Sequence, residues 1–583
     1  MTTWWSRYPA ALDRERHALD ERGFSWSTDE EAFAKGRFVV NLEVRFGGVE
    51  RQLSAYYPDT YPYFAPQVVM SGDRLQRHHN LDGFLCLLER DGEDWIPDVD
   101  TLASVLCTQL QKIEQVNQPG ADAALVAQQE EPAGEPISNF LPYLMPPEVL
   151  LIPDETPSAD VAKGRLEVLL HPGAKAKSIA IGAVNKILDK TGKVILQNPV
   201  ASPHATAPAS GFWCRLQQRP VIGQIAPETL HKLFHELLLA DCPELGKALS
   251  SARRGDMLFG GVVYRDEVSW RTNKDDWVFM KYEVTRERKG ARAASFKMQF
   301  VRSDWSGEET FLQRAPFMRP LRNKSVLLIG AGNVGSPVAI QLARAGVRRL
   351  DIVDPDVLQA GNTVRWALGR REAGQFKAYA LAAYIGVDFP LTEAHPHAFR
   401  IGHCATKPED IVDYFELTRT LIEKADLVID ATASFRASYF IADMAKSLDK
   451  PYLWLTTTHG AAGGVVGRIL PGHTAGCWHC FQRCLGDGSI RLPADSGAEE
   501  VQPGGCTHPT FIGAGLDSDE IAILASRLAV ATLCRGDANG YGDFDWDVAV
   551  GDLQMNGRST APNWSIYPLN AHPGCRACGQ NHQ

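Results

Sequence analysis

The sequence has few cysteines, no long uninterrupted hydrophobic run and no excess of positive charge. Its 583 residues include 12 cysteines, too few for a secreted scaffold held together by disulfides. We therefore expect free thiols, metal ligands or nucleophiles. The longest apolar stretch, Val326–Val347, contains several glycines as well as Asn333 and Arg344, so it does not predict a membrane span.

The charge balance and the first residues also limit the possible partners. The formal net charge of −10 argues against a broad nucleic-acid-binding surface. Residues 1–11 lack the basic head and apolar core of a secretory signal. We expect a soluble, cytoplasmic protein that binds neither nucleic acid nor a membrane.

The length predicts three or four domains, because domains usually contain about 100–200 residues. Near the N-terminus a helical pattern precedes two strand-like runs, and further along a strand, a glycine loop, a helix and a second strand follow one another. The second pattern predicts a mostly parallel, doubly wound sheet. We therefore predict a multi-domain α/β and α+β protein, with a small α+β domain at 1–120, a linker at 121–160, a mixed α/β spacer at 161–318 and a Rossmann-like domain at 319–583.

Residues 330–335 read GAGNVG, a GxGxxG motif between a predicted strand and a predicted helix. Gly330, Gly332 and Gly335 allow a tight turn and let backbone amides approach a phosphate at the start of the helix. Asp354 ends the second strand and is a candidate ribose ligand. The motif alone fits an NAD-dependent dehydrogenase as well as an ATP-binding enzyme.

The order of the charged and polar side chains that follow the loop distinguishes an ATP-binding enzyme from an NAD-dependent dehydrogenase. These residues are Asp354, Asp356, Asn362, Arg365 and Lys377. Acyl adenylation must neutralise growing negative charge on phosphate, which suits two cations, whereas hydride transfer needs no such cluster. The ordered set resembles that of the ubiquitin-activating (ThiF/MoeB-like) adenylation family. The resemblance implies an ATP- and Mg²⁺-dependent adenylation domain in which all five residues bind the nucleotide and the two cations are catalytic.

One acidic residue of that family is missing from this chain. The family has an Asp that helps to carry Mg²⁺ in a short segment after a later strand. In the matching stretch Asp430–Ser434, that position is Ala433. Asp430 or Asp354 is the alternative metal ligand.

Two CxxC pairs supply four thiolates near the C-terminus, namely Cys477, Cys480, Cys575 and Cys578. Four sulfurs satisfy tetrahedral Zn²⁺, and a closed site of this kind is structural. The adenylation family has the same arrangement of two pairs. We expect a structural zinc ion, with two unrelated thiol pairs as the alternative.

Cys506 lies between the two CxxC pairs, in the segment PGGCTHP at 503–509. The flanking glycines indicate an exposed loop, and His508 is near enough in sequence to help lower the pKa of the thiol. In thioester-forming activating enzymes a cysteine in this region attacks the acyl adenylate, and Cys506 resembles it by position. A structural thiol is the alternative. Family members are usually dimers, so a homodimer is expected by analogy.

Four motifs near the N-terminus resemble those of ubiquitin-conjugating enzymes in the same order: YPYFAP at 61–66, HHN at 78–80, GFLCL at 83–87 and WIP at 95–97. The resemblance implies that Cys86 accepts an acyl group and that Asn80 stabilises the oxyanion formed when an amine attacks. Asn80 precedes Cys86 by six residues, where the family usually has eight. Cys107, on the predicted closing helix Thr101–Gln115, is expected in the core.

These features together predict ATP-dependent adenylation of a protein C-terminal carboxylate, a thioester on Cys506, transfer to Cys86 and conjugation to a lysine of a target. The domain order resembles bacterial fused enzymes of anti-phage (CBASS) operons, which implies that a cGAS-like nucleotidyltransferase is conjugated. A separate ubiquitin-like protein is the alternative substrate. The alternative functions are a sulfur-carrier activating enzyme, which leaves Cys86 unexplained, an NAD-dependent oxidoreductase and a non-catalytic interaction protein.

Overall fold

The computed structural model describes residues 3–46, 48–72, 75, 78–80, 83–88, 95–118, 136–143, 147–171, 180–198, 205–222, 227–269, 272–286, 295–403, 413–493, 500–501 and 510–578. The chain divides into two compact units, Met1–Gly307 and Glu308–Gln583. The predicted Rossmann-like domain, from residue 319, lies inside the second unit.

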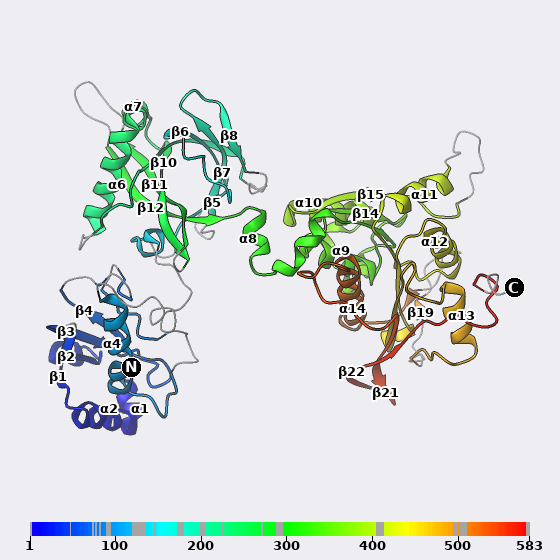
Figure 1. Cartoon of the computed structure of the whole chain (residues 1–583), viewed down its shortest axis with the longest axis horizontal. Coiled ribbons are helices and arrows are strands. Elements are labelled where there is room, and N and C mark those ends of the chain that lie inside the picture. Colours follow the sequence, from blue (N-terminus) through cyan, green and yellow to red (C-terminus); the bar gives the residue numbers. More distant parts are fainter. Residues whose placement is uncertain are drawn as a thin grey trace. The chain divides into compact units, whose positions relative to one another are not determined.

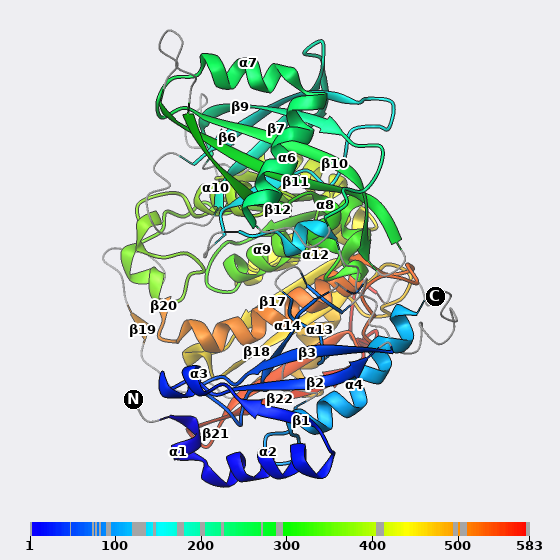
Figure 2. The ribbon, with the colours of Figure 1, turned by 90° about the vertical axis from the view of Figure 1, so that its left-hand side faces the viewer.

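The N-terminal unit begins with a small antiparallel sheet and the helices that pack with it (Figure 1). Four strands pair in sequence order, and the first three are the blue strands that lie side by side in Figure 2. Every second side chain of β2 is buried, including Val40, Leu42 and Val44. The predicted early helix, the two strands and the closing helix are confirmed as α2 Pro9–Glu21, β2 Val39–Phe46, β3 Val49–Tyr56 and α4 Leu102–Asn117. The sequence pattern does not predict four further elements, α1 Trp4–Arg7, β1 Ser25–Thr28, α3 Glu30–Ala34 and β4 Gln67–Met70.

A closed β-barrel forms the second part of this unit, a feature that the sequence pattern does not predict. Strand β5 pairs with β12 on one side and with β7 on the other, so seven strands form a ring, and β8 extends the edge of β7. β5 lies within the predicted linker because a short apolar strand between prolines resembles a linker in composition. The elements are η1 Ile137–Phe140, β5 Val149–Ile152, β6 Lys163–Leu170, β7 Ala180–Asp189, β8 Val194–Gln197, β9 Ala207–Arg215, α6 Pro227–Asp241, α7 Pro243–Ser251, β10 Met257–Ser269, β11 Thr272–Arg286 and β12 Ser295–Trp305.

Both faces of the barrel wall are buried. Along β11, Trp277 and Phe279 belong to one apolar cluster, whereas Val278 and Met280 belong to a second cluster shared with Phe234 of α6. Alternate residues of a strand point to opposite faces, so a strand buried on both faces is apolar without interruption. This explains why the central part of β11 reads as a continuous hydrophobic run.

An eight-stranded sheet forms the centre of the second unit, in the order β15-β14-β13-β16-β17-β18-β21-β22. The first five strands are parallel, which confirms the predicted parallel sheet, and the last three continue it in antiparallel pairing. The strands are β13 Ser325–Ile329, β14 Arg349–Val353, β15 Glu393–His397, β16 Leu427–Asp430, β17 Tyr452–Thr457, β18 Gly463–Ile469, β21 Val548–Met555 and β22 Arg558–Tyr567.

Helices cover both faces of this sheet. One core cluster lies beneath α9, α10 and α14, and a second lies beneath α11, α12 and α13. The remaining elements of the unit are α8 Glu308–Leu312, η2 Pro316–Asn323, α9 Gly335–Arg344, η3 Ala360–Val364, η4 Arg370–Glu372, α10 Lys377–Asp388, α11 Tyr414–Lys424, α12 Phe435–Ser447, η6 His459–Ala461, α13 Trp478–Gly486, β19 Glu500–Val501, β20 Thr510–Phe511 and α14 Gly515–Leu533.

The strand order reverses at β13, which has β14 on one side and β16 on the other. In open α/β sheets, the carboxyl ends of the strands at such a reversal border a ligand-binding crevice. The fold therefore directs attention to the segments that follow these three strands.

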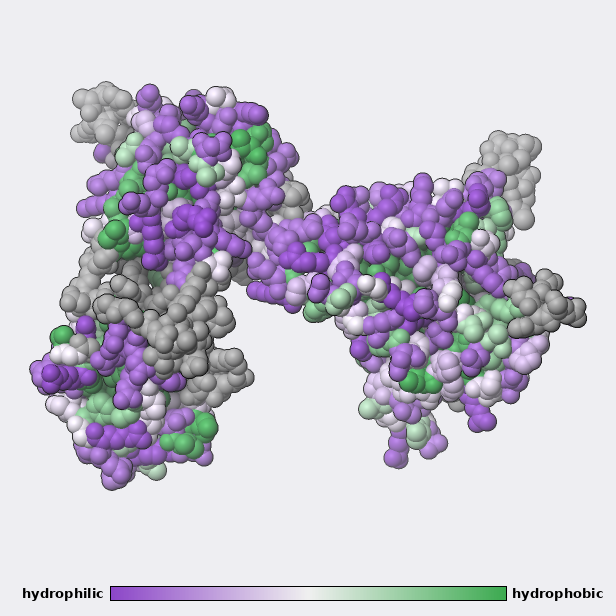
Figure 3. Space-filling view, in the orientation of Figure 1, coloured by the Kyte–Doolittle hydropathy of each residue, from purple (hydrophilic) through white to green (hydrophobic). Residues whose placement is uncertain are grey.

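Hydrophilic residues predominate on the face drawn in Figure 3, where hydrophobic residues form small, separate patches. Within the described parts of the chain, none of the helices has both the length and the hydrophobicity that crossing a membrane requires.

Candidate functional site

A cavity of about 910 Å³ lies at the carboxyl ends of the parallel strands in the second unit. Its lining comes from the segments that follow β13, β14, β15 and β16 and from the end of β17. Its size is within the range of small-molecule binding sites. The cavity therefore occupies the crevice that the strand order predicts.

Two glycines of the loop are needed for its folded conformation, and the third leaves open space in the cavity. Gly330 has a φ of 95°, and a Cβ on Gly335 would lie 1.9 Å from the carbonyl oxygen of Gly330. A Cβ on Gly332 would meet no protein atom within 4 Å, and Gly332 lines the cavity. A phosphate can therefore approach the backbone at Gly332.

Asp354 fixes this loop from the end of β14. Its carboxylate accepts hydrogen bonds from the backbone N–H of Ala331 at 2.7 Å and of Asp356 at 2.8 Å. Burial raises the pKa of Asp354, although the charge of Lys377 and the two amides oppose the rise. A carboxylate in this place suits the hydroxyl groups of a ribose.

Two cationic side chains from the predicted set face the same cavity. Lys377 is the first residue of α10, and its Nζ lies 3.0 Å from Oδ2 of Asp356. Arg365 follows η3, and burial lowers the pKa of its guanidinium, which still stays charged at neutral pH. The cavity thus brings together the predicted residues Gly330, Gly332, Asp354, Asp356, Asn362, Arg365 and Lys377.

Asp430 is placed differently from the residues above. It is buried at the end of β16 and is not among the residues that line the cavity. One of its oxygens accepts from the N–H and hydroxyl of Thr432, and the other accepts from the hydroxyl of Tyr452. Ala433 does line the cavity, with a φ of 50°, a left-handed conformation in which Asp and Asn are enriched. Among the described lining residues, the carboxylates are therefore Asp354 and Asp356.

The structure adds lining residues that the sequence does not reveal. They are Arg400, which follows β15, and a polar rim at the end of β17 that includes Thr456, Thr457 and His459. The carboxyl ends of parallel strands meet at one edge of the sheet, so recognition of β15 would have drawn attention to Arg400. Two histidines and a proline in its five residues hide this strand from a search for apolar alternation.

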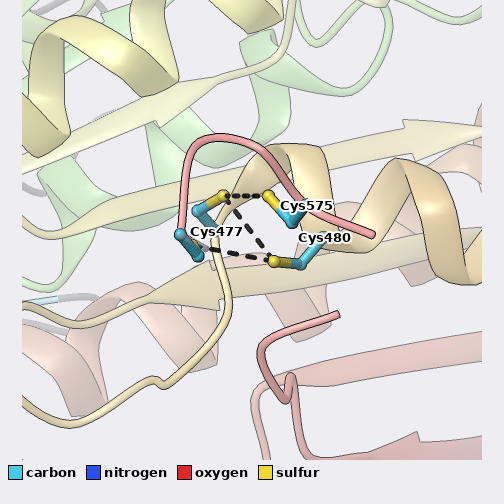
Figure 4. A group of neighbouring side chains, drawn as sticks. Cys477, Cys480 and Cys575 are labelled. Carbon is cyan, nitrogen blue, oxygen red and sulfur yellow. Dashed lines mark hydrogen bonds between the residues drawn. The ribbon is translucent and has the colours of Figure 1, made fainter. Parts of the chain in front are cut away.

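The four CxxC cysteines come together in the second unit, as predicted. Their sulfur atoms all lie within 4.8 Å of one another, and three pairs are separated by 3.8, 3.7 and 3.7 Å. A tetrahedral zinc ion with Zn–S bonds of about 2.3 Å needs sulfur atoms about 3.8 Å apart. Figure 4 shows how Cys477, Cys480 and Cys575 converge.

Nearby groups donate hydrogen bonds to these sulfur atoms. The backbone N–H of His572 donates to Sγ of Cys480 at 3.3 Å, and Nζ of Lys446 lies 3.8 Å from Sγ of Cys578. Donors of this kind favour thiolates and orient metal ligands. The residues present therefore fit a structural zinc ion.

Cys86 is exposed in the N-terminal unit. The backbone N–H of Cys86 donates to the carbonyl of His78 at 2.9 Å. The side-chain oxygen of Asn80 accepts from the N–H of Phe84 at 2.8 Å. The second bond holds the side chain of Asn80 against the segment that carries Cys86.

Two other cysteine predictions have different outcomes. Cys107 is exposed, so its expected place in the core is wrong: the buried stripe of α4 runs through Leu102, Leu106 and Ile113, and residue 107 falls on the other side of the helix. Cys506 lies outside the described residues, together with His508.

Residues 308–526 match the ThiF family, so the second unit contains a ThiF-family adenylation domain. One relative that matches nearly the whole chain is the uncharacterised protein y4oA of Sinorhizobium fredii. It is 28% identical over 99% of this chain and 97% of its own length.

Two further relatives match parts of the chain. The ATP-dependent ubiquitin transferase-like protein Cap2 of Enterobacter hormaechei is 25% identical over 48% of this chain and 50% of its own length. A probable adenylyltransferase/sulfurtransferase, MoeZ of Mycobacterium tuberculosis, is 35% identical over 23% of this chain and 31% of its own. These similarities support ATP-dependent adenylation by the second unit.

Proposed function

We propose that this protein adenylates the C-terminal carboxylate of a partner protein and passes the acyl group through Cys506 and Cys86 to an amine. The observation that best supports this proposal is the cavity in which a glycine loop, two carboxylates and several cations converge. The similarity to Cap2 supports the choice of a protein substrate.

In the first step, an oxygen of the substrate carboxylate attacks the α-phosphorus of ATP, and pyrophosphate leaves. Arg365 and Lys377 neutralise the charge that develops on the phosphate oxygens. Asp354 and Asn362 hold the ribose. Asp356 is the residue that would hold Mg²⁺, which would screen the phosphate charge.

In the following steps, the deprotonated thiol of Cys506 attacks the acyl carbon and AMP leaves. The thiolate of Cys86 then displaces that of Cys506. Finally, the amine of a target lysine attacks, loses a proton and releases Cys86. The two thiols belong to one chain, which raises their effective concentration for each other. The proposed substrate is a cGAS-like nucleotidyltransferase in anti-phage defence, with a ubiquitin-like protein as the alternative.

The relay is tested by non-reducing mass spectrometry of the full chain after incubation with ATP, Mg²⁺ and each substrate. The wild type should carry adducts that a thiol reagent removes. Cys506→Ala should carry none, and Cys86→Ala should keep only the adduct on Cys506.

Cys107→Ala is the matched control, because Cys107 is an exposed thiol in the same unit as Cys86. It should behave as the wild type does. If the chain adenylates its substrate but neither Cys506 nor Cys86 gains an adduct, the relay is wrong and activation of a sulfur carrier explains the site better.

A further inference from the structure

Among the described lining residues, Arg400 is the permanent cation to which the family resemblance gives no role. It follows β15, lines the cavity, and its side chain is 63% exposed. The residue before it, Phe399, is buried and stacks on Tyr414 with ring centroids 5.4 Å apart. The backbone of Arg400 is thus anchored in the core while its guanidinium stays accessible.

Arg400 and Lys377 approach the same carboxylate from two sides. Nη2 of Arg400 lies 3.5 Å from Oδ1 of Asp356, and Nζ of Lys377 lies 3.0 Å from Oδ2. Any anion that Lys377 binds beside Asp356 is therefore close to Arg400 as well. Because Arg400 is more exposed than Lys377, it can leave Asp356 for a ligand at little cost.

The charge of the cavity favours this role. Ala433, which lines the cavity, contributes no charge to it. Among the described lining residues, three permanent cations, Arg365, Lys377 and Arg400, face two carboxylates. A guanidinium presents several N–H donors in one plane, which suits phosphate oxygens.

We infer that Arg400 binds the phosphates of ATP beyond the α-phosphate and neutralises part of their negative charge. This inference rests on the proposed nucleotide site. Arg400 thereby determines the preference of the cavity for a triphosphate over a monophosphate.

The test measures the binding of ATP, AMP and adenosine to the full-length wild type and to Arg400→Ala by titration calorimetry. Loss of a charge-assisted contact should weaken ATP binding about 10-fold to 100-fold. Adenosine and AMP should bind as they do to the wild type. Arg400→Lys keeps the charge without the planar fork and should recover part of the loss.

Arg348→Ala is the matched control, because Arg348 also pairs with a carboxylate, Glu393 at the start of β15, is similarly exposed and does not line the cavity. It should leave all three affinities unchanged. Unchanged ATP affinity in Arg400→Ala, or an equal loss for adenosine, would overturn the inference while the nucleotide site stands. A wild type that binds no ATP would instead contradict the proposed function itself.

Discussion

At the scale of single residues, one glycine of the loop is required for folding and another is required for binding. Gly335 sits against the backbone of Gly330, whereas Gly332 faces open cavity. Substitution by alanine should therefore weaken ATP binding at one of these positions and lower stability at the other.

Gly332→Ala should leave the fold intact and weaken ATP binding at least about tenfold, because the added methyl group occupies space where a phosphate would approach the backbone. Gly335→Ala should destabilise the second unit by about 1–3 kcal/mol, because its methyl group would overlap a backbone oxygen. Thermal unfolding and ATP titration of both variants check this. Equal ATP affinity in Gly332→Ala and the wild type would show that phosphate does not contact this loop.

A buried carboxylate gives the N-terminal unit a dependence on pH. Glu15 of α2 accepts hydrogen bonds from the hydroxyls of Tyr57 and Tyr61 and from the N–H of Leu102. Burial raises the pKa of Glu15 despite these bonds. The folded unit therefore holds a proton that the unfolded chain releases, and stability falls as pH rises from the ordinary Glu pKa through the raised one.

Glu15→Gln should remove this dependence, because an amide cannot titrate. Hydrogen exchange of α2 and α4 in the full chain checks the prediction. The ratio of the exchange protection of these helices in the variant to that in the wild type should be larger at pH 8 than at pH 5. The same ratio at both pH values would mean that Glu15 does not titrate differently in the two states.

At the scale of elements, the cluster of four cysteines connects α13 to the last described residues of the chain. Cys477 and Cys480 lie at the start of α13, and the other two cysteines follow β22, which ends at Tyr567. A metal ion bound by the four cysteines would link the two segments in place of secondary structure.

Cys575→Ser should lose the metal, about one zinc ion per chain in the wild type, and should increase hydrogen exchange in α13 and in residues 569–578. Elemental analysis and exchange mass spectrometry measure both effects. Cys484→Ser is the control, since Cys484 is on the same helix but outside the cluster. A wild type that contains no zinc would contradict this account of the site.

The helices and strands also show how much of the fold the sequence alone predicts. The predicted order of strand, glycine loop, helix and second strand is present as β13, the loop, α9 and β14, because glycine spacing and apolar runs are local signals. The barrel escapes prediction because its closure depends on pairing of β5 with two strands far away in sequence. The sequence does not predict Arg400 as a lining residue for a similar reason, since only the position of β15 in the sheet brings it to the cavity.

At the scale of the whole molecule, we propose a homodimer formed through the second unit. Val364 is 77% exposed and Leu516 is 76% exposed, and the start of α14 lies against residues 364 and 365. Exposed apolar residues that gather beside a ligand site are typical of an interface.

Light scattering should give a mass twice the 64.1 kDa of the chain. Leu516→Asp should shift the mass towards the monomer, because the substitution would bury an unpaired charge in the interface. Ile566→Asp, an exposed apolar position on β22, should not. A monomeric wild type would contradict the proposal.

The central claim is that the second unit activates a carboxylate with ATP, and substrate-dependent exchange of labelled pyrophosphate into ATP tests it most directly. The wild type should exchange label only when a substrate protein with a free C-terminus is present. Lys377→Ala should lower the rate at least about tenfold. Exchange should persist in Cys506→Ala, because adenylation precedes the thiol step. A wild type that binds ATP but exchanges no label with any carboxylate substrate would contradict the account.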